Sequence, residues 1–512
     1  MNAGDGRSRY LLGVDVGQTA VKAVIFDDRL RPISVARRAS PIDRSVSRRA
    51  ERTQAELWST AADAIAEAVA ASSIDPALIA AVGIAGHGDG LHLVTKDGTA
   101  ASPAITAMDS RAHREAAELV ADAGRLKVIL EHSGQVPTAG AAGNILRWLQ
   151  RNDPATIDRA DTVLFCKDVI RLHLTGEFST DYSDACALFL DTTTARWSAE
   201  LVEAYGLPRD IMRLLPPITR SGEIVGHVLP EAALRTGLIA GTPVISGMHD
   251  VQAASIGMGA LIQGRLALVA GSFTTNGVTT RQTDVDARWQ SRLSITPDLR
   301  IAMSTSATAS PAFDWILALL GVTTADGRDS ILADAAALDP RAAVPLILPF
   351  LVDSPLGANA SSVFAGIRSW HTPAHVVRGA LEGIALMHFW HTRALAEKFD
   401  WKQPVLLSGG LSRSPLYAQL VANALRTPVC VVETAEAGAF GAAAVAGVSV
   451  GMFGSIDAAQ EQFVVSGPPI SPTPESADYW SDVRASFDEL VAAVEPWWAA
   501  RATHADRAVD GS

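Results

Sequence analysis

Residues 11–27 read LLGVDVGQTAVKAVIFD, and they hold the clearest structural pattern in the chain. Two apolar, β-branched runs are joined by a short turn at residues 17–19, which is the pattern of a β-hairpin. Asp15 stands at the end of the first run and Lys22 near the start of the second. Because charged residues flank a turn that could form without them, the sequence indicates a chemical role for this turn as well as a connecting one.

A second hairpin pattern occupies residues 264–281, GRLALVAGSFTTNGVTTR. Its apolar strand runs into Gly271, Ser272 and Thr274 before a further strand begins. Two such hairpins, roughly one in each half of the chain, predict a duplicated protein of two lobes. Each lobe would then contribute one turn that faces phosphate.

Strand-like and helix-like segments alternate along the chain, as AAVGIAG and AHVVRGALEGIALMHFWHTRALAEKF illustrate. Such alternation is typical of α/β proteins. We expect an N-terminal lobe over residues 1–250, a C-terminal lobe over 251–455, and a tail with a terminal helix over 456–512. The boundary between the lobes should lie near residues 250–258.

The composition is that of an acidic enzyme. The 512 residues are 48% hydrophobic and carry a formal net charge of −12. Nucleic acids and anionic lipids require a basic surface, so we expect neither as a partner. Three cysteines lie far apart without CxxC spacing, and they are interpreted as buried, reduced thiols of a cytoplasmic protein.

Membrane insertion and secretion are not expected. The N-terminus lacks the apolar core of a signal peptide. The uncharged run at residues 437–454 is long enough to span a bilayer, but it consists largely of alanine and glycine. We therefore expect a tightly packed internal helix there.

The two turns have residue types suited to binding phosphate. Glycine exposes backbone N–H groups without a Cβ in the way, and a threonine adds a hydroxyl. Taken singly, each turn is more often an ordinary hairpin. Asp15 strengthens the phosphate interpretation, because a carboxylate beside bound phosphates is a natural ligand for Mg²⁺ or its water shell.

A third element, LLSGGLSRSPLYAQLVANAL at residues 406–425, combines a strand, Gly409, Gly410, a serine-rich cap that includes Ser414, and an amphipathic helix. Adjacent glycines at a helix entrance let a flat ring or a phosphate approach the backbone. This segment alone supports a structural turn and a nucleotide site about equally. Together with the two hairpins it favours the nucleotide site.

A fourth element is GTPVISGMHDVQAASIGMG at residues 241–259, where an apolar strand leads to Asp250 at the expected junction of the lobes. An aspartate there can accept the proton of a hydroxyl that attacks a γ-phosphoryl group, which is the role of the base in kinases. The alternative is an aspartate that caps the helix beginning near Val251. Both can hold together.

With these four elements in order, the chain resembles the FGGY family of carbohydrate kinases, within the actin-like ATPase superfamily. The resemblance extends from Leu11 to about Gly451. It is carried by GVDVGQTAVKAVIFD and AGSFTTNG for the phosphate motifs, SGGLSRSPLYAQLVAN for adenosine, EAGAFGAAAVAG for an interlobe helix, and GMHDVQAA for the catalytic aspartate. It implies a two-lobed α/β fold of the ribonuclease H-like type, with duplicated βββαβαβ cores and an interlobe cleft.

The resemblance also implies a role for each motif residue, with ATP and Mg²⁺ as cofactors. Asp250 would be the general base and would contact the substrate, and Asp15 would support Mg²⁺. The residues implied at the nucleotide are Gly17, Gln18, Thr19, Lys22, Gly271, Ser272, Thr274, Gly409, Gly410 and Ser414. This chain has GQT and GS where GT is common in the two phosphate motifs, so a hydroxyl is kept in each.

The sugar site is expected within residues 83–113, where xylulokinase-like members carry a corresponding polar segment. His87, Asp89, Asp109 and Arg111 are the candidates for contacting sugar hydroxyls, which are bound by paired donors and acceptors. A glycine-flanked polar turn is the alternative for His87 and Asp89. The overall pattern is most similar to the branch of L-xylulose and 3-keto-L-gulonate kinases.

The expected activity is ATP-dependent phosphorylation of a terminal hydroxyl of a small ketose or polyol. D-xylulose, D-ribulose, erythritol and glycerol are alternative substrates. An actin-like ATPase switch and a non-catalytic sugar-binding regulator are the alternatives from other classes. The expected partners are the sugar and ATP. A homodimer is expected only because members of the family commonly form one.

Overall fold

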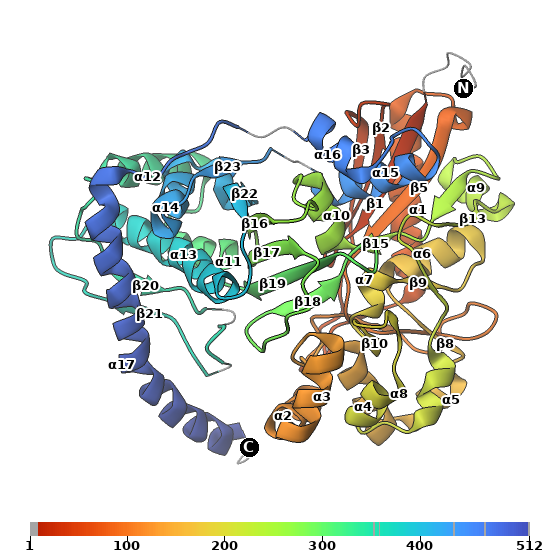
Figure 1. Ribbon diagram of the computed structural model, residues 1–512, viewed down its shortest axis with the longest axis horizontal. Coiled ribbons are helices and arrows are strands. Elements are labelled where there is room, and N and C mark those ends of the chain that lie inside the picture. The colour runs from red at the N-terminus through yellow and green to blue at the C-terminus, as the bar shows by residue number, and fades with distance from the viewer. Residues whose placement is uncertain (1–8, 352–353, 358, 434–435, 465–466, 510–512) are drawn as a thin grey trace. The chain divides into compact units, whose positions relative to one another are not determined.

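A computed structural model describes residues 9–351, 354–357, 359–433, 436–464 and 467–509 (Figure 1). The chain divides into two compact units. Unit 1 comprises the described residues within Met1–Gln263, Thr279–Ala302 and Thr434–Val464, and unit 2 those within Gly264–Val278, Met303–Glu433 and Val465–Ser512. Across the described part of the chain, no helix is both long and apolar enough to cross a bilayer.

The opening stretch forms the predicted hairpin. β1 (Tyr10–Val16) pairs antiparallel with β2 (Ala20–Phe26), and Asp15 lies directly across from Lys22. Side chains alternate between the two faces of a strand. On one face of β1, Leu12, Val14 and Val16 join the core beneath α1 (Gln54–Ser72). Asp15 therefore belongs to the opposite face.

The sheet of unit 1 is mixed. Its strand order is β13-β14-β5-β1-β2-β3, with β5 parallel to β1 and with β15 paired to the end of β5. The strands not yet introduced are β3 (Pro32–Ala39), β5 (Ile79–Gly86), β13 (Ile224–His227), β14 (Pro243–Ile245) and β15 (Met248–His249). β15 leads directly into α10 (Asp250–Gly257).

The alanine-rich and glycine-rich run forms α15 (Ala437–Ser449), which contacts β1, β5 and α10 within unit 1 (Figure 1). The approach is close because glycines stand at the contacts. A Cβ at Gly13 or Gly83 would overlap a backbone carbonyl of α15, and a Cβ at Gly441 of α15 would overlap the Ala253 carbonyl of α10. The expected internal helix is thus confirmed, and it places its N-terminus beside the end of β1.

Gly441→Ala should lower the stability of unit 1. The added methyl group meets backbone atoms of α10, which cannot rotate away, so we expect a loss of about 1–3 kcal/mol from overpacking. The midpoint of urea unfolding measures this loss. Gly454→Ala is the matched control, because no atom lies within 4 Å of its added methyl group. Equal midpoints for the two variants would contradict the close approach.

Unit 2 repeats the core of unit 1. Its strands follow the order β19-β17-β16-β22-β23, which corresponds to β3-β2-β1-β5-β14. In chain order the repeat is βββαβαβ, so the predicted duplication is confirmed. Its elements are β16 (Arg265–Ala270), β17 (Thr274–Thr280), β19 (Arg300–Ser306), α13 (Pro373–Ala396), β22 (Lys402–Ser408), α14 (Pro415–Leu425) and β23 (Val429–Val431).

Further elements extend each core. In unit 1 they include β4 (Glu51–Arg52), β6 (His92–Val94), β7 (Ala104–Ile105), α2 (His113–Ala121), α3 (Ala123–Ser133), α4 (Ala142–Asn152), α5 (Pro154–Arg159), β8 (Thr162–Leu164), α6 (Cys166–Thr175), β9 (Thr180–Asp181), α7 (Tyr182–Ala185), β10 (Leu190–Asp191), β11 (Arg196–Trp197), α8 (Ala199–Ala204), β12 (Ile218–Thr219), α9 (Pro230–Thr236), β18 (Gln290–Leu293) and α16 (Ile456–Phe463). In unit 2 they include α11 (Ser310–Leu319), α12 (Ala325–Ala337), β20 (Leu346–Leu348), β21 (Val363–Ala365) and the terminal helix α17 (Ala477–Val509). All three cysteines are free and buried, as the sequence predicted.

Candidate active site

The turn between β1 and β2 is small and partly open to solvent. The Gly17 N–H donates to the Ala20 carbonyl at 3.0 Å, which closes the turn. The Gln18 carbonyl accepts from Arg52, and Thr19 is exposed. These two hydrogen bonds fix the backbone of the turn, while the Thr19 side chain is accessible to solvent.

Two carboxylates lie near each other beside this turn. The negative charge of Asp250 acts on Asp15 strongly enough to help raise its pKa. Burial is the largest cause, Lys22 opposes it and Glu436 adds to it, and the pKa of Asp15 reaches about 6. Gly438, in the first turn of α15, lies against the Asp15 carboxylate, where a Cβ would come within 2.8 Å. The site is thus rich in negative charge.

Lys22 supplies positive charge at the same end of the sheet. Its Nζ lies 2.8 Å from a carboxylate oxygen of Glu436, and about a quarter of its side chain is exposed. Lys22 also lowers the pKa of Asp15, although burial and Asp250 outweigh it. The structure therefore places the predicted Lys22 next to the predicted Asp15.

Asp250 is the first residue of α10, and its side chain is 37% exposed. His249 occupies the N-cap position of this helix. The nearer carboxylate oxygen lies 3.0 Å from His249 Nδ1. Burial acts to raise the pKa of Asp250, but the charge and hydrogen bond of His249, with His87 and the Val251 N–H, lower it overall. The carboxylate is therefore ionised and accessible near neutral pH.

The segment that carries Asp250 is held by buried hydrogen bonds. The His249 N–H donates to Ser183 Oγ at 2.9 Å, and the Gly247 N–H donates to the Ser221 carbonyl at 3.0 Å. Arg171 donates to the Ser246 carbonyl at 2.9 Å. Three separate parts of unit 1 therefore fix the backbone that leads to Asp250.

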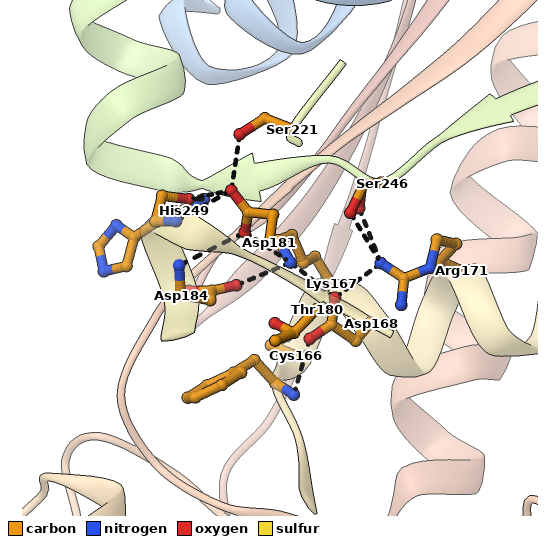
Figure 2. Close-up of polar contacts among 12 residues, drawn as sticks. Cys166, Lys167, Asp168, Arg171, Thr180, Asp181, Asp184, Ser221, Ser246 and His249 are labelled. Atoms are coloured by element: carbon orange, nitrogen blue, oxygen red, sulfur yellow. Dashed lines mark hydrogen bonds and ion pairs between the residues drawn. The ribbon is translucent and has the colours of Figure 1, made fainter. Parts of the chain in front are cut away.

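Behind this segment lies a fully buried charged cluster, shown in Figure 2. Lys167 Nζ lies 2.6 Å from Asp168, 3.0 Å from Asp181 and 3.1 Å from Asp184. Arg171 adds a second cation, 2.8 Å from Asp168. Burial, opposed by Lys167, raises the pKa of Asp184 to about 7. The sequence interpretation missed this buried charged cluster, although charged residues within the otherwise apolar helix α6 were a signal for it.

The predicted sugar-contact residues His87 and Asp89 lie beside His249. Gly88 between them packs on the His249 ring, because a Cβ there would overlap the imidazole. Neither ring nitrogen of His87 has a hydrogen-bond partner within the described residues. Burial, with a smaller effect of Arg52, lowers the pKa of His87 to about 4. The structure thus brings this turn and Asp250 together.

The other two sugar-contact candidates, Asp109 and Arg111, form an ion pair with each other. Arg111 donates to both carboxylate oxygens of Asp109, at 2.8 and 2.7 Å, and the Ala50 N–H donates to the same carboxylate at 2.8 Å. The Arg111 guanidinium also lies over the Trp148 ring, 5.3 Å from its centre. Both side chains are buried, so their visible role is to hold this segment together.

In unit 2 the second predicted turn joins β16 to β17. The Gly271 carbonyl accepts from the Ser310 N–H at 2.8 Å, and Ser272 is exposed. The Thr274 hydroxyl is fully buried and lies 2.8 Å from the Thr308 hydroxyl. The buried Thr274 hydroxyl therefore stabilises the start of β17, whereas the Ser272 hydroxyl is accessible to solvent.

The third predicted element lines a cavity of about 660 Å³ within unit 2. Gly410 and Ser414 contribute to its wall, and Ser414 also caps α14. Gly409 has a φ of +103° and packs against Ala270, which a side chain would prevent. The other lining residues are Ser310, Phe313, Asp314, Arg328, Asp329, Leu332, Ala333, Ala336, Leu381, Leu411, Arg413, Pro415 and Leu416. The cavity volume falls within the range of small-molecule sites.

Two family models match the chain. "FGGY family of carbohydrate kinases, N-terminal domain" matches residues 10–257, and the C-terminal domain of the same family matches residues 266–450.

Named relatives are similar over most of their length. The chain is 28% identical to the L-xylulose/3-keto-L-gulonate kinase of Escherichia coli, over 88% of this chain and 91% of that protein. It is also 28% identical to an Autoinducer-2 kinase of Yersinia pestis, over 89% of each. The crystal structure of xylulose kinase from Rhodospirillum rubrum has a TM-score of 0.87 and 27% identity, covering 96% of this chain and 100% of that one.

Proposed function

This chain belongs to the FGGY family of carbohydrate kinases, and we propose that it transfers the γ-phosphoryl group of ATP to a terminal hydroxyl of L-xylulose or 3-keto-L-gulonate, with Asp250 as general base. As a carbohydrate kinase it is a phosphotransferase. The observation that carries the assignment is the environment of Asp250. Its carboxylate is ionised and partly exposed beside Asp15 and beside the turn at residues 87–89.

In the proposed reaction, Asp250 accepts the proton of the attacking hydroxyl. The hydroxyl oxygen forms a bond to the γ-phosphorus as the bond from that phosphorus to the ADP oxygen breaks. The lowered pKa of Asp250 supports this role, because the carboxylate must be ionised before the proton leaves. Lys22 and the exposed Thr19 and Ser272 hydroxyls are the proposed contacts to phosphate.

The residues present fit Mg²⁺. Asp15 supplies hard carboxylate oxygens. Burial is the main reason that its pKa is raised, and the charges of Asp250 and Glu436, which raise it further, are ones that a cation would offset. Within the described residues, no group of three or more His, Cys, Asp or Glu side chains could hold a metal ion. That agrees with Mg²⁺, which binds through one or two carboxylates together with substrate phosphates and water. When bound through Asp15, Mg²⁺ would neutralise charge on the phosphoryl oxygens.

The cavity beside Gly410 and Ser414 is the proposed site of the adenosine group. Phe313 is fully buried in the wall, and the Arg328 guanidinium lies over its ring, 5.2 Å from the centre. Arg328 is also paired with Asp314 at 2.8 Å, so the wall is both flat and polar. An adenine ring requires stacking surface and a small number of polar partners.

The sugar is the open part of the proposal. The L-xylulose/3-keto-L-gulonate kinase and the Autoinducer-2 kinase are equally similar in identity, so phosphorylation of autoinducer-2 is the second candidate. D-xylulose, D-ribulose, erythritol and glycerol remain further candidates. The turn at residues 87–89 is the proposed determinant of this choice.

A substrate screen tests the proposal. ADP release should rise clearly above the sugar-free rate when the correct sugar is added, because the sugar supplies the hydroxyl that accepts the γ-phosphoryl group. Each compound named above is supplied with MgATP, and the phosphorylated product is identified by mass spectrometry. Equal ADP release with and without every sugar would favour the ATPase switch. Sugar binding without any product would favour the regulator.

A further inference from the structure

Arg292 of β18 is a buried arginine with three polar partners near the proposed base. It donates from Nη2 to both carboxylate oxygens of Asp89, at 3.1 and 3.0 Å, and from Nε to Gln135 Oε1 at 3.1 Å. Its Nη1 lies 3.1 Å from His249 Nε2. Only 5% of Arg292 is exposed, so these partners account for its environment. No motif in the sequence singles out Arg292.

The contact to His249 limits the state of that imidazole. A guanidinium can only donate hydrogen bonds, so the His249 Nε2 that faces it must accept. In neutral imidazole, one ring nitrogen accepts and the other carries the proton. The proton of His249 therefore resides on Nδ1.

His249 Nδ1 has two competing neighbours. It lies 3.0 Å from an Asp250 carboxylate oxygen and 3.1 Å from the Val251 backbone nitrogen. With a proton, Nδ1 donates to Asp250. Without one, it accepts from the Val251 N–H and gives Asp250 no hydrogen bond. The tautomer of His249 thus decides whether the imidazole donates a hydrogen bond to the Asp250 carboxylate.

We propose that Arg292 is a positioning residue that fixes the Nδ1–H tautomer of His249 and thereby orients the Asp250 carboxylate. One carboxylate oxygen of Asp250 is then held by His249, which leaves the other for the hydroxyl of the sugar. The inference rests on the proposed function of Asp250, and it deepens that function. It also assigns Asp89 a part in the network, because its ion pair holds the Arg292 side chain.

Electrostatics around the pair favour this arrangement. His249 is faced by Asp250, Arg292 and Asp184, and Asp250 is faced in addition by His87 and Asp15. Burial and Arg292 oppose protonation of His249, while the two carboxylates favour it. Removing the Arg292 charge would therefore raise the pKa of His249 further and permit an imidazolium at higher pH. An imidazolium beside Asp250 would weaken it as a base.

Arg292→Met and Arg292→Lys test the proposal by kinetics. In Arg292→Met we expect kcat to fall by ~10²-fold from lost positioning, with a smaller change in KM for the sugar. The acid limb of its pH profile should move to higher pH. Arg292→Lys keeps a side chain that only donates and should recover much of kcat. Gln135→Leu is the control for general loosening of Arg292, and its acid limb should stay at the parent position.

A double-mutant cycle separates positioning through His249 from other effects. If Arg292 acts through His249, Arg292→Met should lower kcat little further in a His249→Asn background. Fully additive losses would overturn the proposal. So would a parent-like pH profile for Arg292→Met.

Nitrogen NMR of protein labelled at the histidine rings tests the tautomer without any turnover. The His249 signals, assigned by their loss in His249→Asn, should report a protonated Nδ1 and an unprotonated Nε2 in the parent enzyme. A parent signal of the Nε2–H tautomer would overturn the inference even if the kinase is active. An inactive protein that shows the expected tautomer would instead contradict the proposed function and leave the geometry supported.

Discussion

Asp250→Asn should lower kcat by ~10² to 10⁴, which is the contribution of a general base. Asparagine has nearly the same shape, but it cannot accept a proton at neutral pH. The side chain is 37% exposed, and its hydrogen-bond partners, His249 and the Val251 N–H, can also donate to an asparagine oxygen, so the substitution leaves the packing of α10 in place. KM for ATP should change little, because the proposed adenosine cavity lies in unit 2. Steady-state kinetics with the sugar identified by the screen provide the measurement.

Asp457→Asn is the matched control. Asp457 also stands in the first turn of a helix, α16, and is exposed to solvent. The same chemical change there should leave kcat at the parent value. The midpoints of urea unfolding should agree for the parent and both variants. Near-parent turnover by Asp250→Asn would refute the proposed base, whatever the sugar.

The fold was predictable where the pattern is local. Alternating apolar residues around a glycine turn predict β1 and β2, and the repeat of that pattern at residues 264–281 predicts β16 and β17. The assignment of α15 to unit 1 depends instead on contacts with residues far away in sequence. It follows from backbone approach at Gly13, Gly83 and Gly441, and a glycine in a sequence does not reveal what approaches it.

The candidate site was predictable to a similar extent. Asp15 and Asp250 follow apolar strands into polar turns, so each can be recognised from its own neighbourhood. Arg292 and Lys167 cannot, because their partners come from other parts of the chain. From sequence alone, an isolated arginine or lysine is predicted to be a solvated surface residue, because these residue types are seldom buried. The residues that position the site were therefore found only in the structure.

Lys167→Met should destabilise unit 1 by about 3–5 kcal/mol, which is the typical cost of breaking a buried ion pair from one side. Lys167 is fully buried, and its Nζ contacts Asp168, Asp181 and Asp184. Methionine replaces the length of the side chain but not its charge. Asp168 would keep its pair with Arg171, but Asp181 and Asp184 would lose the Lys167 cation. The shift in the midpoint of urea unfolding of the transition that belongs to unit 1 provides the measurement.

Lys127→Met makes the same substitution at a surface pair. Its side chain is 73% exposed and lies 3.8 Å from Glu131. Such exposed pairs contribute little, so the midpoint should stay within about 0.5 kcal/mol of the parent. Equal midpoints for Lys127→Met and Lys167→Met would contradict the stabilising role of the buried charged cluster.

The stability deficit of Lys167→Met should depend on pH in a defined direction. Burial already raises the pKa of Asp184 to about 7, and loss of the Lys167 charge would raise it further. A carboxyl whose pKa is higher in the folded protein favours folding when protonated, so its penalty grows as pH rises through that pKa. The deficit should therefore be smaller at pH 6 than at pH 8.

Because Arg171 and Ser183 connect the buried charged cluster to the segment carrying Asp250, kcat of Lys167→Met should fall along with stability.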